Sequence, residues 1–420
     1  MNNIFAQADN FNDKLEILSK HFVRMQGYGI YFPIDNGEID YKSPISSGDL
    51  ILRLKDLGLR DKDADIRLII NTDKIQEKTL LDVIYDEIPK WDKRDRFSEM
   101  VESLNLIGSS EKNKLLILKF FMTAYSMAFD GIDQNINWKY FPRVVMILHS
   151  EERTFGKTSF FRKVFFDGVI NKKIPSLDIE LYAELNGTLG VDKKERIAFL
   201  SNYIGINIDD IDEMIITKKD EGQLRSLLTS RASSSRTFYK ESTRHQKRRA
   251  SICGTTNNST LLRDKEEDRY MVFTLKKEID FRLFEEEDFI FQLWSQIKHE
   301  AHNHGDGVQF NSVDRRLIRE IAEAYLYKEE FEHYLDEILI YQDHGTMRFN
   351  QVKEKLWTAG FNGVSPNAIA KALQRLTPSG KSYKRKSGIQ MYNFRFATDE
   401  EKEDISRVGR LERQFASEKR

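Results

Sequence analysis

A short run of residues near the middle of the chain, Gly156-Lys157-Thr158-Ser159, has the composition of a phosphate-binding loop. It follows an apolar stretch at 143–150, which we predict to be a strand, and it opens a predicted helix. Such a loop needs backbone N–H groups at a helix start, a lysine for the β- and γ-phosphates and a hydroxyl for Mg²⁺. We therefore predict that ATP and Mg²⁺ bind here, to Thr154, Phe155, Gly156, Lys157, Thr158 and Ser159.

One position departs from the usual pattern G-x-x-x-x-G-K-[ST]. Glu151 stands where the first glycine is expected. Glycine permits a turn that other residues resist, and a carboxylate adds negative charge near a polyphosphate. The alternative interpretation is a helix start that happens to contain Gly-Lys-Thr.

A second apolar run ends in two adjacent carboxylates, Asp209 and Asp210. One carboxylate of such a pair can hold the hydration shell of Mg²⁺, and its neighbour can polarise the attacking water. We therefore expect Thr158 and Asp209 to support the metal ion and Asp210 to act on the water. Asp210 stands where glutamate is commoner, and its shorter side chain is expected to slow hydrolysis. The alternative is a strand that ends in a solvated acidic turn.

A third apolar run, 249–256, ends in Thr255-Thr256-Asn257. A polar side chain at the end of an adjacent strand can orient the same water, and we expect Asn257 to sense the γ-phosphate in this way. Two further apolar runs, 196–202 and 269–275, are also predicted to be strands. The order of strand, Gly-Lys-Thr and helix, then an acidic strand end, then a polar strand end predicts a P-loop nucleotide-binding domain with a parallel sheet.

In these residues the chain resembles the virulence-associated protein E (VapE/VirE-like) family. These are P-loop proteins of prophages, phage satellites and other mobile elements, and they are similar to superfamily 3 helicases within the AAA+ group. The resemblance extends over roughly residues 80–300. Its motifs are Ile88-Pro89, Trp91-Asp92, Asp95-Arg96, the Gly-Lys-Thr, 207–212, 224–230, Arg236, Tyr239, the Thr-Thr-Asn, 262–264 and Arg269-Tyr270.

The resemblance implies an ATP-dependent helicase or translocase that unwinds or remodels DNA during replication of a mobile element. It also implies a homo-oligomeric ring, such as a hexamer, whose active site is completed by an arginine of the neighbouring subunit. Of four candidate arginines we favour the two that follow the sensor strand, Arg263 and Arg269, over Arg236 and Arg248. A replication initiator or a primase is the expected protein partner.

Two basic segments are candidates for binding DNA. Residues 231–249 contain seven Lys or Arg and one Glu, and the resemblance implies a hairpin here that points into the ring channel. Cations contact phosphates and aromatic rings stack on single-stranded bases. The predicted DNA contacts are Arg236, Tyr239, Lys240, Arg244 and His245 in this hairpin, and Lys384, Arg385 and Lys386 near the C-terminus. The alternative for each segment is a solvated basic loop.

The predicted fold class is α/β, with a P-loop AAA+-like central domain. A mixed N-terminal region precedes it, with a predicted strand pair and a turn at Asp35-Asn36-Gly37. Near the C-terminus, a predicted helix at 349–360 and a second helix N-capped by Ser365 precede a basic hairpin and a strand at 389–396. This order suggests a C-terminal winged-helix-like domain that binds duplex DNA or a partner. The predicted boundaries are 1–88 for the accessory domain, 89–143 for a helical collar, 144–300 for the P-loop domain, 301–397 for the helical and winged-helix-like part, and 398–420 for a charged tail.

Composition narrows the class of protein further. Among 420 residues, 66 are Lys or Arg and 67 are Asp or Glu, so a globally basic DNA binder is excluded while local basic patches are not. A single cysteine excludes an intramolecular disulfide framework. Without an apolar run of about 20 residues, a cytoplasmic protein with no membrane partner is expected. Two other functions stay open: a hydrolytically weak nucleotide-binding scaffold and a DNA-binding regulator without nucleotide.

Overall fold

The computed structural model describes most of the chain, in two compact units that we treat separately. The described residues are 5, 8, 10–25, 29–72, 75–108, 110–136, 143–167, 180–186, 200–216, 218–229, 232–236, 243–262, 268–325, 329–342, 347–377, 384–386, 389–399 and 401–402. The first unit comprises Met1–Asn257 and Arg269–Arg315, and the second comprises Asn258–Asp268 and Arg316–Arg420. The domain boundaries expected from the sequence remain predictions.

The N-terminal part of the first unit is a small mixed sheet covered by helices. Its strands run in the order β3-β2-β1-β5, with β4 beside β2. Their bounds are β1 (Phe22–Met25), β2 (Ile30–Asp35), β3 (Glu38–Ile39), β4 (Ile45–Ser46) and β5 (Glu77–Lys78). The predicted turn between β2 and β3 is confirmed, with positive φ at Asn36 and Gly37. The flanking segments are helices, namely α1 (Phe11–His21), α2 (Ser47–Asp56), α3 (Asp63–Ile70) and α4 (Leu80–Glu87).

A five-stranded parallel sheet forms the centre of the first unit, with strand order β12-β6-β11-β8-β7. The bounds are β6 (Val145–His149), β7 (Tyr182–Asn186), β8 (Gly205–Asp209), β11 (Ser251–Thr256) and β12 (Tyr270–Thr274). Four of these strands were predicted as apolar runs and are confirmed. They are nearly all buried along their length, as expected for strands covered on both faces.

In this region one strand was missed and one prediction was wrong. The strand β7 was missed because polar side chains alternate along it, as at an edge strand. Conversely, the apolar run 196–202 was predicted to be a strand, but its described end, 200–202, is helical. The carbonyl of Leu200 accepts hydrogen bonds from the backbone N–H groups of Arg249 and Ala250, so this run lies beside the entry to β11.

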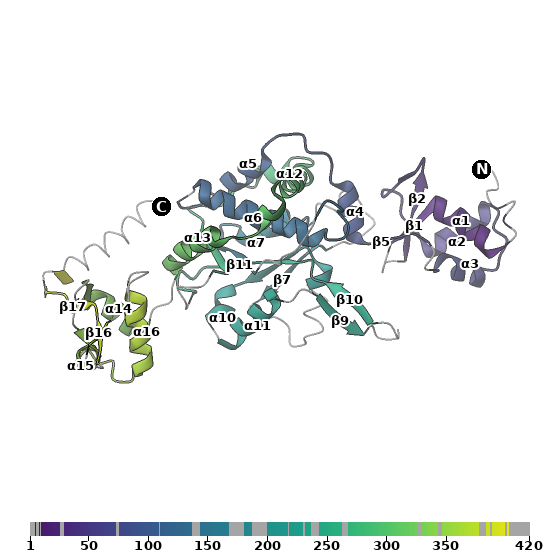
Figure 1. The fold of residues 1–420 in the computed structure, drawn as a ribbon. Helices are drawn as coiled ribbons and strands as arrows, with labels where there is room; N and C mark the ends of the chain where they lie inside the picture. The colour runs from purple at the N-terminus through teal and green to yellow at the C-terminus, as the bar shows by residue number, and fades with distance from the viewer. Residues whose placement is uncertain are drawn as a thin grey trace. The chain divides into compact units, whose positions relative to one another are not determined.

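Helices cover both faces of the sheet (Figure 1), with α5, α6, α7 and α12 above it and α10 and α11 below it. Their bounds are α5 (Arg96–Ser103), α6 (Glu111–Ala128), α7 (Lys157–Val164), α10 (Ile211–Ile216), α11 (Lys218–Thr229) and α12 (Phe289–His304). Two glycines allow close contact: a Cβ at Gly205 would overlap the Phe165 ring, and one at Gly254 would lie 2.6 Å from Ile211 Cδ1. An aromatic cluster of Phe121, Phe165 and Trp294 joins α6, α7 and α12.

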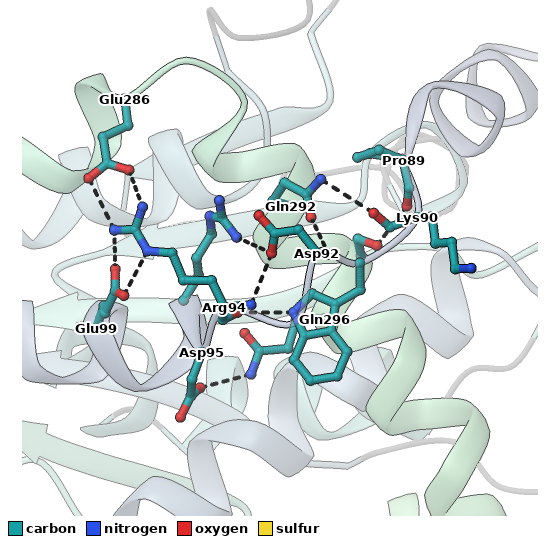
Figure 2. A network of polar contacts seen from close by, with 12 residues as sticks. Pro89, Lys90, Asp92, Arg94, Asp95, Glu99, Glu286, Gln292 and Gln296 are labelled. Atoms are coloured by element: carbon teal, nitrogen blue, oxygen red, sulfur yellow. Dashed lines mark hydrogen bonds and ion pairs between the residues drawn. The ribbon is translucent and has the colours of Figure 1, made fainter.

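Polar contacts join the segment before α5 to α12 and to the residues that precede α12 (Figure 2). Arg94 forms ion pairs with Glu99 and with Glu286, which follows the short helix η1 (Arg282–Glu285). On α12, Gln292 and Gln296 accept hydrogen bonds from the backbone N–H groups of Asp92 and Phe97, respectively. Segments that lie far apart in the sequence therefore meet beside the sheet.

The second unit contains helices and short antiparallel strands around its own core. The strand order is β14-β16-β15, and β13 pairs with β17. The bounds are α14 (Glu330–Ile338), β13 (Leu339–Tyr341), β14 (Met347–Arg348), α15 (Phe349–Thr358), α16 (Pro366–Leu376), β15 (Lys384–Lys386), β16 (Ile389–Tyr392) and β17 (Phe394–Phe396). The predicted N-cap at Ser365 is confirmed, since its hydroxyl accepts from the Ala368 N–H at 3.2 Å.

One strand predicted in the second unit is divided. The run 389–396 was expected to be a single strand, but β16 ends at Tyr392 and β17 begins at Phe394. The two halves pair with different partners, because β16 lies between β14 and β15 whereas β17 pairs with β13.

The remaining described helices connect these parts of the chain, and they are η2 (Gly305–Val308), α13 (Ser312–Ala322) and η3 (Glu323–Tyr325). Within the described part of the chain, no helix combines the length and the apolar character needed to cross a bilayer.

Truncating the buried indole that joins α12 to α7 should destabilise the first unit. Trp294 is fully buried and its Nε1 donates to the Val164 carbonyl at 2.8 Å. We expect Trp294→Ala to lower the free energy of unfolding by about 3–5 kcal/mol, because it leaves a cavity and an unpaired carbonyl. Trp357→Ala, at a side chain that is 63% exposed, should change it by less than about 0.5 kcal/mol. Chemical denaturation followed by circular dichroism measures both, and equal effects would contradict the assigned packing.

Candidate nucleotide site

Three strand ends meet at one edge of the central sheet. The strands β6, β8 and β11 are parallel, so their carboxyl ends lie at the same edge, where open α/β sheets bind ligands. Because β11 lies between β6 and β8, the residue after it, Asn257, falls between the predicted phosphate loop and the predicted acidic pair. The strand order thus brings together side chains such as Lys157 and Asn257, which are 100 positions apart in sequence.

The loop from Ser150 to Gly156 joins β6 to α7. Gly156 is the N-cap of α7 and has a φ of +82°, a conformation that side chains rarely adopt. A Cβ at Gly156 would lie 2.6 Å from Cε2 of Phe281, so this ring supports the loop from behind. The Phe155 carbonyl accepts a hydrogen bond from the Ile279 N–H at 3.1 Å. The segment before η1 therefore holds the loop against the sheet.

Glu151 does not strain the loop as its replacement of glycine suggested. Its φ lies outside the positive region, which within 143–167 contains only Gly156 and Phe166. The Ser150 hydroxyl donates to the Glu152 carbonyl, which closes a tight turn without a glycine at 151. The missing first glycine is therefore compatible with this backbone.

Lys157 is buried and bridges the ends of two strands. Its Nζ donates to Ser150 Oγ at 2.6 Å and to Asn257 Oδ1 at 2.8 Å, and it lies 3.3 Å from the Glu152 carbonyl. Burial lowers the pKa of Lys157, and the negative charges of Asp209 and Asp210 oppose this shift. An anion bound here would restore the favourable environment of the ammonium group.

The carboxylates lie opposite the helix start. Asp209 Oδ1 is 3.4 Å from Thr158 Oγ1, and it also accepts a hydrogen bond from the Thr255 hydroxyl. Asp210 is exposed and has a φ of +48°. Partial desolvation of its carboxyl group and the neighbouring carboxylates Asp209 and Asp212 raise the pKa of Asp210, which strengthens it as a proton acceptor.

These groups line one cavity of about 430 Å³. Every residue predicted to bind nucleotide or metal lines this cavity, except Phe155. Arg153 lines it as well, although it was not predicted. The lining residues are Arg153, Thr154, Gly156, Lys157, Thr158, Ser159, Asp209, Asp210 and Asn257. Two hard oxygen donors, from Thr158 and Asp209, suit Mg²⁺. Ser150 and Phe281 were missed: a lone serine has no motif, and Phe281 reaches the loop only through the fold.

The candidate arginines Arg248 and Arg269 do not line this cavity. Arg269 immediately precedes β12, and its carbonyl accepts from the Val145 N–H at the start of β6. It therefore lies about one strand length, roughly 15 Å, from the phosphate loop of its own chain. Arg248 is fully buried against backbone carbonyls, so its candidacy as an arginine presented to a neighbour was wrong. Arg263 lies outside the described residues.

The basic segment does form a hairpin, as the resemblance implied. Strands β9 (Ala232–Arg236) and β10 (Thr243–Lys247) pair antiparallel, with Arg244 opposite Ser235 and His245 opposite Ser234. Tyr239 and Lys240 lie outside the described residues. In the second unit, Lys384, Arg385 and Lys386 form β15, which pairs with β16. The side chains in these strands that were predicted to bind DNA are not described.

Comparison with known proteins identifies the family. The model of the virulence-associated protein E-like domain matches residues 85–327, which is more than half of the chain. The chain belongs to the virulence-associated protein E-like family. This confirms the resemblance seen in the sequence. Among curated proteins there is no match.

Several solved structures are similar to this chain at low identity. The apo structure of the NrS-1 C-terminal region has 10% identity and a TM-score of 0.38, covering 90% of this chain and 97% of that chain. An A-form apo structure of the same NrS-1 region has 12% identity and a TM-score of 0.36, covering 86% and 84%.

Adding a single methyl group at the N-cap of α7 should destabilise the loop. Gly156→Ala places a Cβ against Phe281 and forces a positive φ, so we expect a loss of about 1–3 kcal/mol in the free energy of unfolding. Gly222→Ala, on α11 with no atom within 4 Å of its added Cβ and no positive φ, should be neutral or stabilising. Equal thermal midpoints for the two variants would contradict the described loop geometry.

The histidine that ends β6 should make stability depend on pH. His149 lies 2.9 Å, through Nδ1, from Thr274 Oγ1, and burial and the nearby Lys157 lower the pKa of His149 to about 4. Between pH 6.5 and 4 the unfolded chain binds a proton that the folded chain does not, so the free energy of unfolding falls as pH falls. His149→Gln should remove up to about 3 kcal/mol of this dependence. His304→Gln, at an exposed site, is the control. If the free energy of unfolding of both variants depends on pH in the same way, His149 is not a buried neutral imidazole.

Proposed function

We propose that this chain is an ATP-dependent DNA helicase or translocase that acts in the replication of a phage, satellite or other mobile element. The observation that carries the proposal is the convergence of Lys157, Thr158, Asp209 and Asn257 on one cavity at the carboxyl edge of a parallel sheet. These residue types match the parts that phosphoryl transfer from ATP requires: a cation, a metal-binding hydroxyl and carboxylate, and a polar sensor.

Each group has a role in the proposed reaction. Lys157 leaves Ser150 and Asn257 to bind the β- and γ-phosphates, while backbone N–H groups at the start of α7 surround them. Thr158 and Asp209 would hold Mg²⁺, which would neutralise charge on the phosphates. Asp210 orients and deprotonates the attacking water, and its raised pKa favours this role. Asn257, released from Lys157, contacts the γ-phosphate.

The strand order supports the AAA+-like assignment of this domain. The strand β11 lies between the phosphate-loop strand β6 and the acidic strand β8, a position from which Asn257 can reach the γ-phosphate. In the proposed ring, such as a hexamer, Arg269 or Arg263 of a neighbouring subunit completes the site. The position of Arg269 at the opposite edge of the sheet from the loop supports a role in trans rather than within its own chain.

Two elements supply the proposed DNA contacts. The β9–β10 hairpin carries Arg236, Tyr239, Lys240, Arg244 and His245 for single-stranded DNA. In the second unit, α14 is followed by the short strands β13 and β14, the helices α15 and α16, and the antiparallel pair β15–β16. This order supports a winged-helix-like domain whose Lys384, Arg385 and Lys386 contact duplex DNA or a protein partner such as an initiator or primase.

A specific feature favours a second function, a nucleotide-binding scaffold that hydrolyses ATP weakly and recruits or blocks replication proteins. The position of the water-activating carboxylate is occupied by Asp210, whose backbone is left-handed and whose side chain is shorter than glutamate. The two functions share nucleotide binding and differ in turnover.

Removing the loop lysine tests the proposed site. We expect Lys157→Ala to lower ATP hydrolysis by at least about 100-fold, because the cation that stabilises developing charge on the phosphates is lost. Lys112→Ala, which removes a lysine at an exposed position in the first turn of α6, should leave hydrolysis within about twofold. Steady-state hydrolysis and fluorescent-nucleotide binding are measured together. Full activity in Lys157→Ala would refute the site, and nucleotide binding without turnover in the wild type would select the scaffold.

A further inference from the structure

Arg248 is a buried cation that fastens one helix end to the segment leaving the hairpin. It lies between β10 and β11 and is 3% exposed. Its Nη1 donates to the carbonyls of Leu228 at 3.0 Å and Leu227 at 3.3 Å, and its Nε donates to the Ala250 carbonyl at 3.0 Å. The two leucine carbonyls belong to the last turn of α11, where carbonyls lack intrahelical donors and attract a cation.

The charge of Arg248 is poorly compensated for a buried group. Within the described part of the chain, Arg248 has no charged partner and its Nη2 has no hydrogen-bond partner. Burial lowers the pKa of Arg248 to about 10. Burying a guanidinium without a carboxylate is costly, and an apolar side chain could fill the same space at lower cost. The arrangement suits a residue that fixes geometry rather than one that maximises stability.

The position of Arg248 links both arms of the hairpin. The chain leaves the acidic strand β8, passes through α10 and α11, and enters β9; it returns through β10 and passes Arg248 into β11 (Figure 1). Arg248 therefore ties the helix that leads into the hairpin to the segment that leads out of it. The neighbouring Arg249 is bound differently, since its Nη1 donates to carbonyls of Ala128 and Asp130 at the end of α6.

The strand before the hairpin, β8, and the strand after it, β11, both end at the candidate nucleotide site. The strand β8 ends at Asp209, and Asn257, which accepts from Lys157 at 2.8 Å, follows β11. A nucleotide that displaces Lys157 from Asn257 would shift the end of β11 relative to that of β8. A rigid guanidinium with donors in fixed directions can transmit such a shift to the hairpin base.

We propose that Arg248 is a positioning residue that couples the nucleotide site to the DNA-binding hairpin. The inference rests on the proposed function and deepens it, because it assigns the coupling to one buried contact. Arg248→Lys keeps the charge, but its single ammonium cannot reproduce the fixed fork that holds the end of α11 and Ala250 together. Arg249→Lys is the matched control, since it makes the same exchange at the adjacent residue and weakens the contact with α6 instead.

The test measures coupling as a ratio of affinities. Fluorescence anisotropy gives the Kd for a labelled single-stranded oligothymidine with and without Mg²⁺ and a non-hydrolysable ATP analogue. In the wild type and in Arg249→Lys we expect the analogue to change this Kd by at least about fivefold. In Arg248→Lys the ratio should fall to within about twofold of one, while the Kd for each ligand alone changes by less than about twofold. Linkage requires the DNA to change the analogue affinity by the same factor, which is an internal check.

Other outcomes overturn the inference. An unchanged ratio in Arg248→Lys excludes the coupling role. If Arg248→Lys and Arg249→Lys lower the affinity ratio equally, the effect comes from packing of the whole segment. If Arg248→Lys weakens the binding of DNA alone and of the analogue alone and also lowers the Tm, Arg248 has only a structural role. If the analogue leaves the wild-type Kd for DNA unchanged while hydrolysis still depends on Lys157, the coupling is excluded and the ATPase proposal stands. If the analogue does not bind the wild type at all, the proposed function fails and the coupling fails with it.

Discussion

A buried ammonium group between two strand ends is the interaction on which the site depends. Lys157 holds Ser150, after β6, and Asn257, after β11, through hydrogen bonds of 2.6 and 2.8 Å. A buried cation needs partners, and here they are the polar atoms of Ser150 and Asn257, which in the proposed function would be replaced by phosphate oxygens. The strand order β6-β11-β8 makes this possible, because it places Asn257 between the loop and Asp209.

Close packing around this edge keeps its geometry. Phe281 lies behind Gly156, Phe165 lies against Gly205 and Ile211 lies against Gly254, so three glycines admit neighbours where any side chain would overlap them. An ion pair between Glu286 and Arg94, which precedes α5, in turn holds the segment that contains Phe281. The loop 150–156 is thus held by Phe281 and by its own Gly156, and the Ser150–Glu152 hydrogen bond closes its turn, so Glu151 is accommodated.

The local elements of this fold could be predicted from the sequence, whereas their long-range contacts could not. Apolar runs predicted β6, β8, β11 and β12, because strands buried on both faces are continuously apolar. The alternating polar residues of β7 concealed an edge strand, and the helical residues 200–202 resemble a strand because a short apolar run has no distinguishing period. The cavity residues followed from motifs, but Phe281 and the burial of Arg248 depend on tertiary packing alone.

The most direct test of the central claim is a crystal structure with Mg²⁺ and a non-hydrolysable ATP analogue. The account predicts that Lys157 Nζ leaves Ser150 and Asn257 and binds the β- and γ-phosphate oxygens. It also predicts that Mg²⁺ lies between Thr158 and Asp209 and that Asn257 faces the γ-phosphate. A nucleotide bound elsewhere, or one bound while Lys157 still contacts Ser150 and Asn257, would contradict the account.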